Sequence, residues 1–137
     1  MSAPISIGEL IDKITILELK KEHIHEPAKR ANVLHELTEL QALWTTVKAF
    51  DGHETLLDEL RSVNAALWDV EDRLRAFEAT AAFGDAFIQD ARSVYKLNDR
   101  RAAIKREINL RAGSDLVEEK SYAGATGPAA TADGEAR

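Results

Sequence analysis

Apolar residues recur at intervals of three and four along most of the chain, and this spacing predicts long helices. The first helix is expected directly after Ser6, because Ser6 and Glu9 have the spacing of a capping box, and its apolar stripe extends to Ile24. Pro27 ends this helix or begins the next one, since its ring disfavours helical geometry in the preceding residue. A second helix is expected from about Ala28 to Phe50.

The third helix, expected from about Glu54 to Glu78, has the most regular repeat in the chain. Its apolar side chains form two tracks with a spacing of seven residues, which is typical of a helix packed along a neighbour in a coiled coil. A mixed polar stripe lies beside these tracks. The first track is Leu56, Val63, Val70 and Phe77, the second is Leu60, Leu67 and Leu74, and the mixed stripe is Asn64, Trp68, Glu71 and Arg75.

The fourth helix, expected from Ile88 to Gly113, has polar residues where a bundle helix usually has apolar ones. One row of positions along this helix has a cation among apolar residues. The neighbouring row consists mostly of amides and cations. Buried polar groups are costly unless they have partners, so we expect groups elsewhere in the chain to bind them. We call the four polar residues of these rows the polar seam: Asn98, Arg101, Lys105 and Asn109.

Four helices with short connections predict an all-α fold, an antiparallel bundle of about four long helices with a disordered C-terminal tail. We expect one domain over residues 1–122 and a disordered segment over 123–137, which lacks large apolar groups. Leu116, Val117 and Tyr122 are expected to dock on the bundle. Helices of ~25 residues would be ~37 Å long, which is long for a small monomer. A homodimer centred on the third helix is therefore expected.

Charge and composition narrow the possible partners. The net charge is -6, yet the segment from Arg92 to Arg111 carries seven cations and two acids. Acidic residues interrupt this basic face and no aromatic side chains alternate with it, so nucleic-acid binding is not expected. The chain has no cysteine, no signal-peptide pattern and no apolar run of membrane-spanning length. We expect a cytoplasmic protein without membrane association.

The polar seam has two interpretations, and the sequence leaves both open. Arg101 and Lys105 lie one turn apart and suit an anion pocket, because the planar guanidinium matches carboxylate or phosphate oxygens. Alternatively, the cations pair internally with Glu71 and Asp72 of the third helix, or with Glu118 and Glu119. The candidate ligand-binding residues are Arg101, Lys105, Asn98, Asn109, Glu71, Asn64, Arg92 and Tyr95.

Metal and nucleophilic chemistry have little support in the sequence. Glu22 and His25 have the Glu-x-x-His spacing of di-iron bundles, but such sites need two of these motifs and the chain has one. A nucleophilic serine motif and a glycine-rich phosphate loop are both missing from the sequence. We therefore expect no metal and no cofactor.

Four strings, GELIDKITILE, VNxxLWDVED, ARSVYxxNDxRAxIKREIN and EEKSY, run from residue 8 to residue 122. Together they resemble a family of small, uncharacterised, all-helical bacterial proteins. The resemblance implies no established activity, and it implies that the polar seam and the EEKSY segment are features of the family. It also implies a link to surface-glycan metabolism. The expected function is a binding or adaptor module that holds an anionic ligand or a protein partner.

Two alternatives accompany this expectation. The segment from Glu9 to Leu17 loosely resembles the opening helix of small all-helical chorismate mutases, although the cation expected early in that helix is missing. A pericyclic reaction needs only positioning and electrostatic complementarity, so a small enzyme acting on a polyanionic substrate is chemically sufficient. The other alternative is a purely structural dimer.

Overall fold

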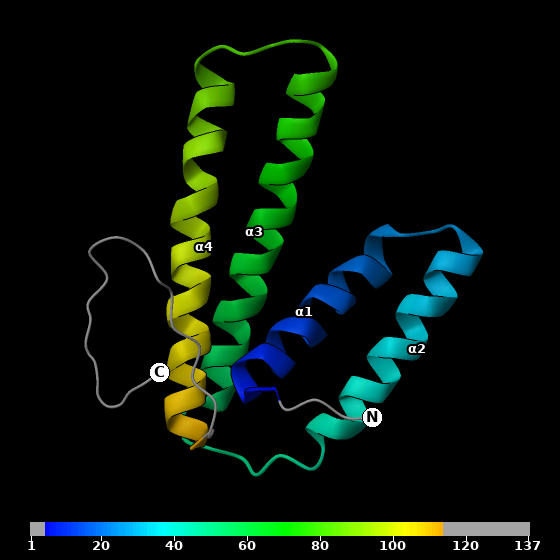
Figure 1. Cartoon of the computed structure of the whole chain (residues 1–137), viewed down its shortest axis with the longest axis vertical. Helices are drawn as coiled ribbons and strands as arrows, with labels where there is room; N and C mark the ends of the chain where they lie inside the picture. The colour runs from blue at the N-terminus through cyan, green and yellow to red at the C-terminus, as the bar shows by residue number, and fades with distance from the viewer. Residues whose placement is uncertain (1–4, 114–137) are drawn as a thin grey trace.

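A computed structural model describes residues 5–113, and all regular secondary structure in this range is helical (Figure 1). The predicted all-α fold with four helices is confirmed, whereas the expectations for residues 114–137 lie outside the described residues. None of the helices in the described range is apolar enough over its length to cross a membrane. The helices are α1 (Ile7–His23), α2 (Pro27–Trp44), α3 (His53–Ala79) and α4 (Asp85–Ala112).

Local capping residues determine several helix ends. The Ser6 hydroxyl accepts a hydrogen bond from the Glu9 amide at 3.1 Å, as the capping-box spacing predicts. Pro27 occupies the first turn of α2, where its missing N–H costs nothing. Gly113 ends α4 with a φ of 68°, a left-handed conformation that glycine adopts without strain.

The predicted end of α2 at Phe50 is wrong, because the helix stops at Trp44. Thr45 and Thr46 follow, and their hydroxyls donate to the carbonyl oxygens of Ala42 and Leu43 at 2.6 and 2.7 Å. Threonine side chains that bond to nearby backbone groups compete with helix hydrogen bonding. The backbone bonds change at the same place, because the amides of Thr46 and Val47 donate to the carbonyl oxygens of Leu43 and Trp44, three residues back rather than four.

The four helices form two hairpins that meet at an angle (Figure 1). The long hairpin is made of α3 and α4, and the short one of α1 and α2. Of the two short helices, α1 packs against both α3 and α4, whereas α2 packs mainly against α1 and reaches the core of the long hairpin through Trp44. The half of the long hairpin nearest its connecting loop therefore extends beyond α1, and α1 is the helix through which the two hairpins are joined.

Because α1 lies between α2 and the long hairpin, it contributes to two apolar clusters. Ile11 is buried with residues of α3 and α4, while Leu10, Ile14 and Leu17 are buried with residues of α2. The predicted burial of Leu67 in the core is confirmed. The heptad side chains that are buried within the chain are Leu56, Leu60, Val63, Leu67 and Val70.

Candidate functional site

A buried carboxylate lies where α1 meets the long hairpin. Asp12 of α1 is 1% exposed, and both of its carboxylate oxygens accept hydrogen bonds from Arg101 of α4. The Nε of Arg101 donates to Oδ1 at 2.8 Å, and Nη2 donates to Oδ2. This two-bond geometry matches the planar guanidinium to the carboxylate and fixes the orientation of both groups.

Polar groups from α1, α3 and α4 complete this arrangement. Asn64 of α3 donates through Nδ2 to Oδ1 of Asp12 at 3.0 Å, and the same nitrogen lies 2.7 Å from the Thr15 hydroxyl. The Lys105 ammonium donates to Glu9 at 2.7 Å and lies 3.9 Å from Oδ2 of Asp12. We call this set the Asp12 network: Glu9, Asp12, Thr15, Asn64, Arg101 and Lys105.

The surroundings of Asp12 keep it ionised. Burial by itself raises the pKa of the carboxyl group, but hydrogen bonds from Arg101 and Asn64 and the charges of Arg101 and Lys105 lower it. The lowering effects outweigh burial, so the pKa of Asp12 lies below its ordinary value of 3.8. With Glu9 included, two carboxylates face two cations. Charge compensation of this kind is what makes burial of ions tolerable.

The N-terminal turn of α1 lies unusually close to α4. The backbone amide of Gly8 donates to Oδ1 of Asn109 at 2.7 Å. A Cβ atom at position 8 would lie 2.6 Å from the backbone carbonyl oxygen of Lys105, closer than atoms can pack. Glycine is therefore required for this approach, and Asn109 satisfies an amide that the first turn of a helix leaves without a partner.

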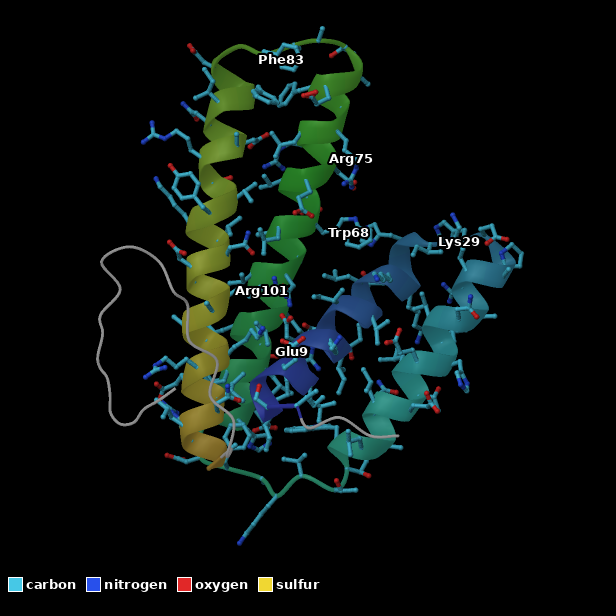
Figure 2. All side chains as sticks on the ribbon, in the orientation of Figure 1. Glu9, Lys29, Trp68, Arg75, Phe83 and Arg101 are labelled. Atoms are coloured by element: carbon cyan, nitrogen blue, oxygen red, sulfur yellow. The ribbon has the colours of Figure 1, made fainter. Side chains whose placement is uncertain are left out.

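Two surface cavities of about 230 Å³ each adjoin the Asp12 network. The first lies between α1, Glu36 of α2 and Arg101, and the second lies between α1, α3 and α4. Figure 2 shows Arg101 beside the crossing of α1, and Trp68 on α3 near the far end of α1. Because Ile16, Lys20 and Arg101 line both cavities, we call the pair the Arg101 groove.

Comparison with known proteins identifies the family. The sequence profile described as a family of unknown function, DUF6165, matches residues 1–134. The chain belongs to the DUF6165 family. The predicted membership of an uncharacterised family is therefore confirmed. No curated protein and no solved structure matches the chain.

The structure of this DUF6165 protein brings together part of the predicted ligand-binding set. Arg101, Asn98, Asn64 and Glu71 line the second cavity of the groove. Lys105 and Asn109 are buried behind it, at 8% and 0% exposure. Arg92 and Tyr95 are exposed and line neither cavity of the groove.

The carboxylates that bind the polar seam come from α1, a helix that was not expected to supply them. Glu71 was expected to be an acidic counterpart of Arg101 and Lys105, but the described hydrogen bonds place Asp12 and Glu9 of α1 in that role. A signal was present in the sequence, because Gly8, Asp12 and Thr15 have helical spacing and lie among the apolar residues of the first helix. Glu71 is exposed at the edge of the groove.

The DUF6165 residues within 5–113 include no group of three histidine, aspartate or glutamate side chains able to hold a metal ion. Arg101 and Lys105, which a chorismate-mutase-like site would use to hold a dicarboxylate, already bind Asp12 and Glu9. Lys105 also lines neither cavity, so only Arg101 of this pair is placed to contact a ligand, which weakens the support for that alternative. The side chain of Arg101 nevertheless lines the groove and is 28% exposed.

Proposed function

We propose that this DUF6165 protein is a binding module whose Arg101 groove holds a small organic anion. The observation that carries the proposal is the placement of Arg101. Its guanidinium is oriented by Asp12, yet the side chain is 28% exposed and lines both cavities. A cation that is already held in one orientation loses little conformational entropy when it binds a ligand. Less of the favourable interaction energy is therefore offset by ordering the side chain.

Charge distinguishes the two cavities. The first is lined by three cations and three carboxylates, so an anion there meets as much repulsion as attraction. In the second, Lys20 and Arg101 face one carboxylate, that of Glu71. We therefore assign the anionic group of the ligand to the second cavity, between α1, α3 and α4.

The lining of the second cavity also constrains the rest of the ligand. Leu67 and Trp68 provide an apolar wall, and the amides of Asn64 and Asn98 provide hydrogen-bonding groups. A mostly apolar lining with a few oriented polar groups is usual for small-molecule sites. Its volume of about 230 Å³ suits a compact ligand, such as a sugar phosphate or a small dicarboxylate. The expected link to surface-glycan metabolism favours phosphorylated sugars.

Lys20 offers a test that leaves the Asp12 network intact. Within residues 5–113 its ammonium takes part in no described ion pair, so Lys20→Gln should fold normally. The matched control is Lys21→Gln, because Lys21 is exposed and lines neither cavity. Thermal shift and calorimetric titration would use inorganic phosphate, sugar phosphates, nucleotide sugars and dicarboxylates.

We expect at least one of these anions to raise the melting temperature of the wild type. The increase should be reduced severalfold in Lys20→Gln and retained in Lys21→Gln, because only Lys20 faces the groove. If no anion in the panel changes the melting temperature, or if both variants respond as the wild type does, the groove is not an anion site.

A further inference from the structure

Two side chains of opposite charge line the first cavity of the Arg101 groove without pairing with each other. Lys20 comes from α1 and Glu36 from α2, so the two charges lie on different helices around the cavity. Within residues 5–113 neither side chain takes part in an ion pair or a side-chain hydrogen bond. The cavity therefore offers one free cation and one free carboxylate to a ligand.

The other charges of the first cavity already have partners. Arg101 donates two hydrogen bonds to Asp12, and Lys105 donates one to Glu9 at 2.7 Å. Lys13 lies 3.9 Å from the second carboxylate oxygen of Glu9. A ligand thus meets a cavity whose unmatched charges are one positive and one negative. A group with a single negative charge can satisfy only one of them.

The two cavities of the groove adjoin each other, because Ile16, Lys20 and Arg101 line both of them. A ligand can therefore extend from one cavity into the other past these side chains. Its anionic group belongs in the second cavity, where cations outnumber carboxylates among the described lining residues. The remaining part of the ligand then enters the first cavity, where it meets the carboxylate of Glu36.

We propose that the ligand of the Arg101 groove is a small zwitterion, with its anionic group in the second cavity and an ammonium group beside Glu36 in the first. This assignment rests on the proposed function, because it names the class of anion that the groove binds. The two charged groups of the ligand must be several bonds apart, since they occupy separate cavities. An α-amino acid has its ammonium on the carbon next to the carboxylate and is too short, whereas an amino sugar phosphate has the required separation.

Glu36 also provides selectivity among anions. A carboxylate attracts an ammonium group and repels a second negative charge at the same position. A dicarboxylate that extends into the first cavity brings its second negative charge toward Glu36, so it should bind less well than a zwitterion of similar length. Specific sites commonly combine attraction for one ligand with repulsion of its competitors. Because Glu36 is exposed, water weakens both effects, and the expected differences in affinity are severalfold.

Two sugar phosphates that differ in one group test the assignment in the full-length chain. Glucosamine 6-phosphate carries an ammonium group where glucose 6-phosphate has a hydroxyl, and a slightly acidic buffer keeps that group protonated. In calorimetric titrations the wild type should bind the amino sugar phosphate roughly threefold more tightly. Glu36→Gln should remove this preference without weakening the binding of glucose 6-phosphate. Glu39→Gln is the matched control, because Glu39 is exposed on the same helix and lines neither cavity.

Failure of the ammonium site can be distinguished from failure of the anion site. If glucose 6-phosphate binds and glucosamine 6-phosphate binds no more tightly, the ammonium site is refuted while the anion site stands. The same holds if Glu36→Gln keeps the preference of the wild type, or if Glu39→Gln loses it. If neither phosphate binds the wild type, the zwitterion is refuted, and Lys20→Gln with the wider panel of anions decides whether the groove binds any anion. Circular dichroism would verify that the variants remain helical.

Discussion

Replacing Asp12 with asparagine tests whether the Asp12 network joins the two hairpins. Asparagine has nearly the same shape, so the change removes the charge without creating a cavity. The guanidinium of Arg101 then loses an ionised acceptor, and Lys105 loses one of its two neighbouring carboxylates. Two cations consequently remain at the centre of the structure with only Glu9 among the described network to compensate them.

The structure sets the expected magnitude. Removing one partner of a buried ion pair typically destabilises a protein by about 3–5 kcal/mol. Arg101 keeps 28% exposure of its side chain and Lys105 stays 2.7 Å from Glu9, so both cations retain some solvation or pairing. We therefore expect Asp12→Asn to lower the free energy of unfolding by about 3 kcal/mol. For a domain of this size that corresponds to a melting temperature lower by about 12 °C.

Equilibrium unfolding in urea, followed by far-UV circular dichroism at neutral pH, would measure this change. Urea is preferred to guanidinium chloride, because dissolved ions screen the interactions under test. Asp58→Asn is the matched control. Its ion pair with Arg61 is exposed, with side-chain exposures of 77% and 47%. Exposed pairs contribute about 0.2–1 kcal/mol, so the control should unfold almost as the wild type does.

Equal destabilisation by Asp12→Asn and Asp58→Asn would refute the reasoning. It would show that the buried ion pair stabilises the protein no more than the exposed one. A double variant adds a second criterion. Once Asp12 is neutral, Arg101→Met should cost less than it does in the wild type, since the charge it removes has already lost its partner. Additive effects of the two substitutions would show that Asp12 and Arg101 are not coupled.

Three further predictions follow from packing and charge. Gly8→Ala should lower the free energy of unfolding in urea by about 1–3 kcal/mol, because the added Cβ overlaps the carbonyl oxygen of Lys105; an unchanged stability would contradict the close approach. Leu67→Ala should cost about 2–5 kcal/mol because Leu67 is buried, whereas Leu43→Ala at 46% exposure should cost little, and equal costs would contradict the core assignment. The pKa of Asp12 is lowered on folding, so its stabilisation is complete above the unfolded value of 3.8 and is lost as pH falls through the folded value. Urea unfolding at pH 5 and pH 3 should therefore differ more in the wild type than in Asp12→Asn, and equal differences would contradict this role.

Most of the secondary structure could be predicted because the signals that produce it are local. The bounds predicted for the third helix, Glu54 to Glu78, differ by one residue at each end from α3. Ser6 and Gly113 also act as helix caps in the structure. The end of α2 was predicted less well, since Thr45 and Thr46 interrupt a segment whose apolar spacing continues beyond them.

Only the cations of the candidate site could be predicted from the sequence. Arg101 and Lys105 occupy helix positions that face the interior, so their need for acidic partners was visible in the sequence. The sequence did not show which acids those partners would be. Asp12 and Glu71 are both acids on helices next to α4, and helical spacing allows either of them to face α4. Which acid reaches Arg101 depends on the angle at which α1 crosses the long hairpin.

The sequence by itself determined the four helices, the inward face of each and the presence of charged groups in the interior, because spacing along a helix and capping residues act within a few positions. The tertiary structure decided which groups meet. Asp12 and Arg101 are far apart in the chain, and they come together because Gly8 allows α1 to lie directly on α4. That approach depends on packing among three helices at once, and no local pattern encodes it.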